Sequence, residues 1–307
     1  MPKNLKRTGK SQRTGEACIS LGTKQNGDEG YDTWLFNCFA NSKLWNNFSS
    51  QSIITGRRVV LGPQHRFLLT DYVRDMHWEG LLNIPSRVYP QLVKFFYSNL
   101  AVIEDPKGYY LGSFVKGKPI LLSVSDIAQI LGIPQGDPQD YFWDADDLRE
   151  MVDENVFYET LTRDCLFRGA LHSRDLLLKY RVLIRFLVEN VVPKGGHYDD
   201  LTSFQSYVLY KIVTHGSLSL PFVLMKEMDD DAQSFARSLS FGAFLTKVFR
   251  HFGVSLKDET ELVLKNLINK TTISHMKLSK LIIPNAPRVD APIQGENLTV
   301  TGGVTPV

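Results

Sequence analysis

The stretch that decides the fold is YPQLVKFFYSNLAVIEDPKGYYLGSFVKGKPILLSVSDIAQILGIP, residues Tyr89–Pro134. Pro90 suits the first turn of a helix, where its missing N–H has no intrahelical partner to lose. The apolar residues of this helix form one face: Leu92, Phe95, Phe96 and Leu100. A short β-hairpin that turns at Lys116-Gly117 comes next, and a second helix then ends at Gly132 and Pro134. The stretch therefore predicts helix, hairpin and helix in that order.

Outside this stretch the apolar residues recur mostly at helical spacing. Helices are expected after Asp32, over Arg66–Leu82, over Asp175–Val192, after the N-cap Thr202, from Ser219, over Phe241–Phe252 and from Asp258 or Thr260 to Ile268. The predicted fold is mainly α: one or more multi-helix domains with a single small β-hairpin near residues 109–122, and disordered termini.

Changes in composition divide the chain. The first residues are rich in Lys, Gly, Thr and Gln, and the last are rich in Pro and Gly, so neither end can bury enough apolar surface to become ordered. We predict a disordered basic tail over 1–31, a helical subdomain with the hairpin over 32–134, an acidic linker over 135–155, a second helical subdomain over 156–283, and a disordered tail over 284–307.

The bulk composition excludes several classes of protein. The 307 residues are 43% hydrophobic, which is typical of a protein with a globular core, and their net charge of +2 is too small to imply a polyanion partner for the whole chain. Three widely spaced cysteines do not suggest a disulfide framework, and no apolar run reaches the roughly 18 residues of a membrane span. We therefore expect an intracellular protein, nuclear or cytoplasmic, without a membrane partner.

The basic tail is the one candidate for nucleic-acid binding. Its candidate contact residues are Lys3, Lys6, Arg7, Lys10 and Arg13. On a flexible arm these side chains could contact phosphates without reading sequence. A weak nuclear-import signal and a merely solubilising tail are the alternatives. Three arginines of the second half, Arg174, Arg181 and Arg185, are expected to lie on a partly solvated helix face and not in a groove of nucleic acid.

No motif for catalysis or cofactor binding occurs with the neighbouring residues that it requires. Gly112–Lys118 matches the first part of a phosphate-binding loop, but Pro119 replaces the Ser or Thr that such a loop needs, so a hairpin turn is favoured. The sequence has no zinc-binding spacing of His and Cys, no GxSxG elbow and no Asp-Thr-Gly or Asp-Ser-Gly. We predict no catalytic residue, no metal and no cofactor, and we expect most residues of the aromatic stripes to be core.

Several runs together resemble the putative plant transposon protein domain. They are WEGLL from Trp78, the helix of Tyr89–Leu100, the hairpin of Val115–Ile120, the run Ile127–Pro134, and in the second half Arg181–Pro193, Gly196-His197 and Tyr207–Val213. The resemblance covers roughly residues 34–253. It implies a plant, transposon-associated helical domain of undefined activity, with no catalytic residues to carry over.

The sequence therefore favours a non-enzymatic helical module that acts by protein–protein or weak nucleic-acid contacts. Its expected partner is an unidentified protein or a second copy of the chain, with nonspecific nucleic acid as a further partner through the tail. Two alternatives come from other classes: a capsid-like structural protein that self-assembles, and a fragment of a degenerate transposon enzyme.

Overall fold

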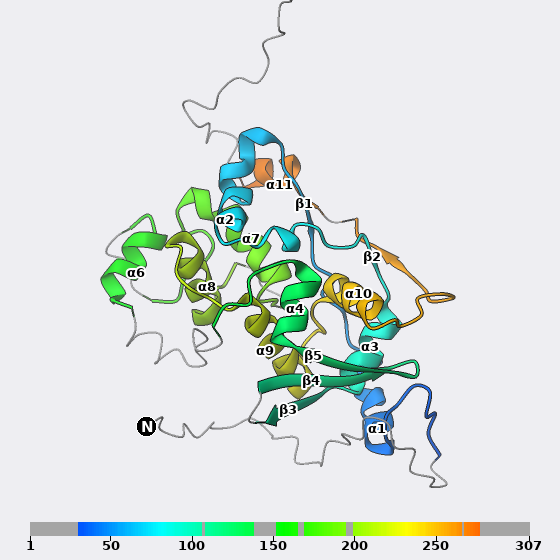
Figure 1. Ribbon diagram of the computed structural model, residues 1–307. Coiled ribbons are helices and arrows are strands. Elements are labelled where there is room, and N and C mark those ends of the chain that lie inside the picture. Colours follow the sequence, from blue (N-terminus) through cyan, green and yellow to red (C-terminus); the bar gives the residue numbers. More distant parts are fainter. Residues whose placement is uncertain are drawn as a thin grey trace, which may run out of the picture.

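A computed structural model describes residues 30–105, 108–137, 152–164, 169–194, 199–265 and 267–276 (Figure 1). Its helices are α1 (Phe39–Phe48), α2 (Thr70–Asp75), α3 (Pro90–Ser98), α4 (Val124–Leu131), α6 (Glu154–Leu161), α7 (Arg181–Asn190), α8 (Ser203–Val213), α9 (Leu220–Gln233), α10 (Gly242–His251) and α11 (Lys270–His275). Its strands are β1 (Arg58–Val60), β2 (Arg87–Val88), β3 (Ala101–Asp105), β4 (Gly108–Val115), β5 (Lys118–Ser123), β6 (Leu262–Val263) and β7 (Leu267–Asn269). Short 3₁₀ turns lie at Pro63–Leu68, Glu79–Leu81 and Leu178–Tyr180.

The stretch 89–134 folds in the predicted order of helix, hairpin and helix. Lys116 and Gly117 both have positive φ, 48° and 74°, which suits a two-residue turn whose twist matches the strands. Ser123 begins α4 with a capping box, because its hydroxyl accepts the amide of Asp126 while the Asp126 carboxylate accepts the amide of Ser123. Gly132 then ends α4 in the left-handed region, at φ 65°. The order of the elements, the turn at Lys116-Gly117 and the end of α4 at Gly132 are confirmed.

The prediction of a mainly α fold with one hairpin is wrong. Among the described residues, seven strands form three small sheets. The largest has the order β3-β4-β5, so the hairpin gains a third, antiparallel strand in which Val102 pairs with Leu111. The other two join distant parts of the chain: β1 pairs with β7 in parallel, and β2 pairs with β6 antiparallel. Strands of two or three residues are too short to show a period of two, and their partners lie far away in sequence.

Two predicted helices are also wrong. The one expected from Asp258 or Thr260 is replaced by β6 and β7, and Asp258 has a left-handed φ of 64°, which a helix cannot continue through. The one expected over Arg66–Leu82 is broken into two 3₁₀ turns around α2, with His77 at φ 57°. Elsewhere the helices exist but their ends shift: α7 begins at Arg181, and α9 continues to Gln233.

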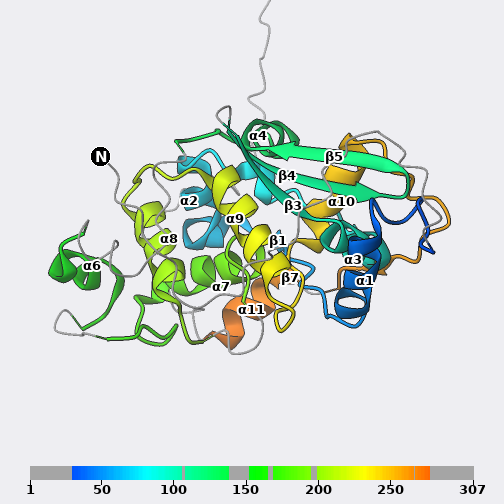
Figure 2. The ribbon, with the colours of Figure 1, turned by 90° about the horizontal axis from the view of Figure 1, so that it is seen from below.

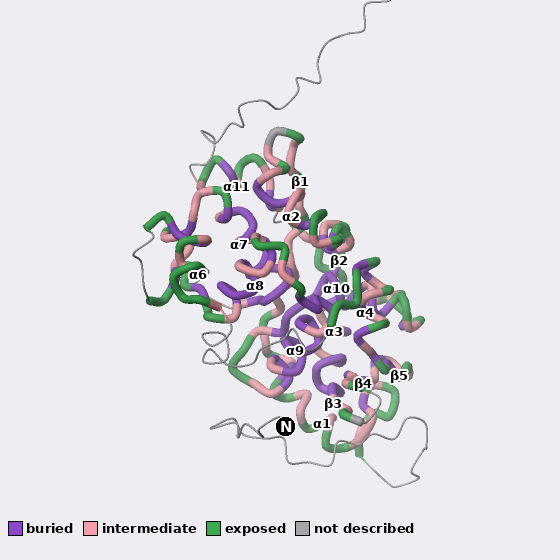
Figure 3. Tube along the Cα trace, turned by 60° about the vertical axis from the view of Figure 1, so that its left-hand side comes forward, coloured by how far each residue is buried: buried purple, intermediate pink, exposed green. Residues whose placement is uncertain are grey.

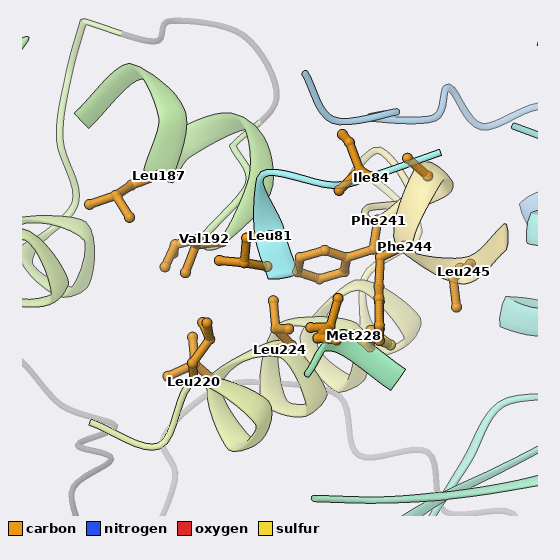
Figure 4. Close-up of a cluster of buried hydrophobic side chains, with 14 of the residues drawn as sticks. Leu81, Ile84, Leu187, Val192, Leu220, Leu224, Met228, Phe241, Phe244 and Leu245 are labelled. Carbon is orange, nitrogen blue, oxygen red and sulfur yellow. The ribbon is translucent and has the colours of Figure 1, made fainter. Parts of the chain in front are cut away.

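One hydrophobic core draws residues from both sides of the predicted linker. Figure 4 shows Leu81 and Ile84 beside Leu224 and Met228 of α9 and Phe241 at the start of α10, all of them buried. The buried residues gather along the inner helices α7 to α10 (Figure 3). The aromatic stripes confirm the expectation of core: Phe95, Phe96, Tyr97, Phe241, Phe244 and Phe249 are buried.

The linker lies mostly outside the described residues. Its first part is tied to α9, since the Ser219 hydroxyl donates to the Gln135 carbonyl at 2.6 Å. The division into subdomains at 135–155 therefore stays a prediction, although both sides contribute to one core. Residues 1–29 and 277–307, which include most of the predicted disordered tails, also lie outside the described residues. Figures 1 and 2 place α6 at one end of the molecule and the β3-β4-β5 sheet with α1 at the other.

Candidate functional site

A cavity of about 310 Å³ lies between α6 and α8, at the end of the molecule opposite the three-stranded sheet. Its lining comes from the start of α6, from a loop after residue 168 and from the start of α8. The lining residues are Val152, Glu154, Phe157, Tyr158, Gly169, Ala170, Leu171, Leu201, Ser203, Ser206 and Tyr207. The volume is at the lower end of the range for ligand pockets, roughly 300–1,000 Å³.

Local sequence signals place the two helices. Asp153 caps α6, because its Oδ1 accepts the amides of Asn155 and Val156 at 2.9 and 3.1 Å. Thr202 caps α8 with a capping box, in which its hydroxyl accepts the Gln205 amide and the Gln205 Oε1 accepts the Thr202 amide. This second cap confirms the helix start predicted at Thr202.

A short backbone bridge joins the two loops of the cavity. The Leu201 amide donates to the Leu171 carbonyl at 2.9 Å, and His172 pairs with Asp200 in an antiparallel bridge. The side chains of this pair also meet, with 2.8 Å between His172 Nδ1 and Asp200 Oδ1. Because Leu171 and Leu201 are both buried, the bridge fixes two apolar residues in the wall of the cavity.

The hydroxyl groups of Tyr158 and Ser206 hold the protein's own backbone. The Tyr158 hydroxyl donates to the Gly169 carbonyl at 2.9 Å and accepts the Gly169 amide at 3.2 Å. The Ser206 hydroxyl donates to the Thr202 carbonyl at 3.1 Å, one turn earlier. Phe157 packs its ring against Tyr210, with 5.3 Å between the centroids. Both hydroxyls are thus bonded to the protein's own backbone, and the Phe157 ring adds apolar surface to the lining.

Comparison with known protein families gives a match. A family model described as the putative plant retrotransposon-related domain matches residues 74–255, more than half of the chain. The chain belongs to this family. No curated protein and no solved structure matches it. The resemblance predicted from the sequence over 34–253 is thus confirmed at the level of the family for residues 74–253, and the chain contains a retrotransposon-related domain. The matched residues include the whole of the stretch 89–134 and every residue that lines the cavity.

The charged helix α9 of the retrotransposon-related domain is the part that most resembles a metal-dependent site. Its sequence LPFVLMKEMDDDAQ places Glu227, Asp229 and Asp231 in buried positions. Two of these carboxylates accept hydrogen bonds within the fold. Asp229 accepts one from the Tyr109 hydroxyl at 3.1 Å, and Asp231 accepts one from the Ser240 amide at 3.0 Å. Among the described residues, no three His, Cys, Asp or Glu side chains are grouped to hold a metal ion.

Asp231 and Ser240 connect α9 to α3. The Ser240 carbonyl accepts the hydroxyl of the fully buried Tyr97 at 3.1 Å, while the Ser240 amide donates to Asp231. Arg237 lies 3.5 Å from the Asp231 carboxylate. Burial raises the pKa of Asp231 to about 6, against the lowering effect of these partners.

Asp231 should make the domain less stable as the pH rises from about 4 to about 6. The folded chain then binds more protons than the unfolded chain, because the pKa of Asp231 is about 6 when folded and 3.8 otherwise. Asparagine resembles the protonated acid and still accepts the Ser240 amide. Asp231→Asn should therefore raise the free energy of unfolding relative to the unmodified chain by up to about 3 kcal/mol at pH 7, and by much less at pH 4. Urea denaturation of both chains between pH 4 and 7 measures this difference. A difference that stays constant across that range would contradict the assignment.

The other residues singled out from the sequence are not brought to the cavity. Lys3, Lys6, Arg7, Lys10 and Arg13 lie outside the described residues, so nucleic-acid binding by the tail stays a prediction. Lys116 of the Gly112–Lys118 motif sits in the β4–β5 turn and pairs with Glu259 at 2.6 Å, which confirms the hairpin. Arg185 pairs with Glu189 one turn along α7, at 2.8 Å.

Sequence reasoning did not point to the cavity residues. The cap Thr202 predicts where α8 begins, whereas Asp153 belongs to the acidic run assigned to the linker, and Phe157-Tyr158 is an aromatic pair on an amphipathic helix, which is usually core. Nothing in the sequence predicts that the beginnings of α6 and α8 face one another. Among the described residues, no helix combines the length and the apolar composition needed to cross a bilayer.

Proposed function

We propose that this retrotransposon-related domain is a non-enzymatic binding module, and that it holds a segment of a partner protein in the cavity between α6 and α8. The observation that carries the proposal is the lining of that cavity. Val152, Phe157, Leu171 and Leu201 provide apolar surface, while the hydroxyls of Tyr158 and Ser206 are bonded to the protein's own backbone. Such a lining favours a bulky apolar side chain of a partner, which gains affinity by leaving water.

Two further observations support the proposal. The Asp229 and Asp231 carboxylates of α9, which could otherwise suggest metal-dependent chemistry, are hydrogen-bonded to Tyr109 and Ser240 in the fold. The cavity also has a rim that can be changed without disturbing the core, because Ala170 and Ser203 line it and are exposed. A ligand can therefore reach the cavity from solvent past these two residues.

Filling the cavity tests the proposal. Peptides from a random phage-display library are selected for binding to the full-length chain. The selected peptides are then tested for binding to the variant Ser203→Trp, whose indole occupies the mouth of the cavity. Ser274→Trp is the matched control, because Ser274 is an exposed helical serine on α11, away from the cavity. Enriched peptides should bind the unmodified chain and the control, and should lose at least tenfold in affinity for Ser203→Trp. Peptides that bind all three chains equally would overturn the proposal, and so would a selection that enriches none.

A further inference from the structure

Carboxylates lie on two sides of the α6–α8 cavity. On the α6 side, Glu154 lines the cavity and Asp153 precedes it, and both are exposed. On the side of the backbone bridge, Asp199 and Asp200 come directly before Leu201, which lines the wall. The side chain of Asp200 is 56% exposed. Glu154 therefore places negative charge in the lining of the cavity, and Asp199 and Asp200 add negative charge next to the wall residue Leu201.

Cations balance these carboxylates only in part, because Arg181 interacts electrostatically with Asp199 and His172 lies 2.8 Å from the Asp200 carboxylate. The described residues 152–164, 169–181, 194 and 199–203 contain seven Asp or Glu and five Lys or Arg. One of the five, Lys194, is turned to the backbone, where its Nζ donates to the Asp200 carbonyl at 2.8 Å. Asp153 and Asp199 are partly satisfied by the α6 amides and by the Ser173 hydroxyl. Glu154 has no hydrogen-bond or ion-pair partner among the described residues.

An exposed carboxylate at the mouth of an apolar cavity can select the ligand by charge. A lysine or arginine next to the apolar anchor would lie against Glu154 without losing contact with water, whereas a glutamate there would be repelled. One exposed ion pair changes the affinity only modestly. A basic ligand residue gains affinity from Glu154, however, and an acidic one loses it. The difference in affinity between a basic and an acidic ligand is therefore larger than either change alone.

We infer that the partner segment is cationic: a bulky apolar residue enters the α6–α8 cavity, and Lys or Arg beside it faces Glu154 and the acidic residues before Leu201. This inference rests on the proposed function. It commits to a segment of another protein, and it names the chemistry that recognises it, an apolar anchor with basic neighbours.

A library with a fixed anchor tests the inference. Displayed peptides with a central Leu, Phe, Trp or Met and random flanking positions are selected on the full-length chain, on Glu154→Lys and on Glu159→Lys. The last is the matched control, because Glu159 is an exposed glutamate of the same helix that does not line the cavity. Lys and Arg should be enriched over Asp and Glu beside the anchor for the unmodified chain and for Glu159→Lys, and this preference should disappear or reverse for Glu154→Lys.

Affinity measurements complete the test. The most enriched peptide is synthesised with a fluorescent label, together with a counterpart in which Glu replaces its basic residues. Fluorescence anisotropy should show the counterpart binding about tenfold or more weakly at low salt, and the gap should narrow in 0.5 M NaCl.

The outcomes separate this inference from the proposed function. Flanks without charge preference, in peptides that still fail to bind Ser203→Trp, would overturn the inference and leave the proposed function standing. An absence of peptides that depend on the cavity would overturn both. Peptides that keep their affinity when the anchor becomes serine would show binding by charge alone and would also overturn the inference. Enriched sequences that match this chain's own basic and apolar residues 277–288, KLSKLIIPNAPR, would assign the cavity to the chain itself and overturn the claim of a partner protein.

Discussion

Replacing Gly80 by alanine should cost the domain most of its stability. An ideal Cβ at Gly80 would lie 1.6 Å from the Leu131 carbonyl oxygen and 2.7 Å from the Leu131 carbonyl carbon. Both are backbone atoms at the end of α4, so no side-chain rotation can relieve the overlap. The turn Glu79–Leu81 and α4 would have to separate, which would loosen the buried residues Trp78 and Leu81. We expect a loss of at least about 4 kcal/mol, a size reached only by severe damage to a core.

A second glycine at the same contact provides the control for Gly80→Ala. Gly132 follows α4 at φ 65°, but an added Cβ there would meet nothing within 4 Å. Gly132→Ala should therefore cost only about 1–2 kcal/mol, from the left-handed backbone alone. Urea denaturation followed by circular dichroism measures both variants, provided that Gly80→Ala folds; if it does not, its insolubility or lack of a cooperative transition is itself the expected result. Equal and small losses at the two glycines would show that the approach of Gly80 to Leu131 is not tight.

The same contact explains why part of the fold could not be predicted. The spacing of apolar residues in Arg66–Leu82 suits one continuous helix, yet the chain turns at His77 so that Gly80 can approach α4. That approach joins residues about fifty positions apart in sequence, and no local pattern records it. The pairings of β1 with β7 and of β2 with β6 are of the same kind, since each strand of two or three residues is stable only beside its distant partner.

Features with local causes could be predicted. The turn at Lys116-Gly117, the end of α4 at Gly132 and the start of α8 at Thr202 each depend on residues within one or two turns of the chain. Only part of the candidate site could be predicted from the sequence, because the rest depends on contacts between distant residues. Thr202 predicts the start of α8, whereas the cavity requires α6 and α8 to be brought together by the Leu171–Leu201 bridge.

Replacing Asn99 should release the segment before α1 from the rest of the domain. Asn99 is 3% exposed, and its side chain forms four contacts with backbone groups. Nδ2 lies within 3.0 Å of the carbonyl oxygens of Leu35, Phe95 and Phe114, and Oδ1 accepts the amide of Asn37 at 3.0 Å. One amide group thus joins the segment before α1, the end of α3 and the β4–β5 hairpin. An apolar residue of similar size would leave buried donors and acceptors without partners, at about 1–3 kcal/mol each, so Asn99→Leu should cost about 3 kcal/mol or more.

Asn99→Asp gives a sharper test, because it keeps the acceptor and removes the donor. At pH 7 a buried carboxylate would face three carbonyl oxygens, so this variant should be at least as unstable as Asn99→Leu. Protonation restores one O–H donor. The folded state would therefore favour the protonated acid, and stability should increase as the pH falls from 7 towards 4, the opposite of ordinary acid denaturation.

Ser98→Ala is the matched control, since the buried Ser98 hydroxyl donates to the Lys94 carbonyl of its own helix. This variant should cost less than about 1 kcal/mol at every pH. Urea denaturation followed by circular dichroism at several pH values distinguishes these results. A difference in stability between the unmodified chain and Asn99→Asp that does not shrink as the pH falls from 7 to 4 would show that the Asn99 side chain does not depend on its donors.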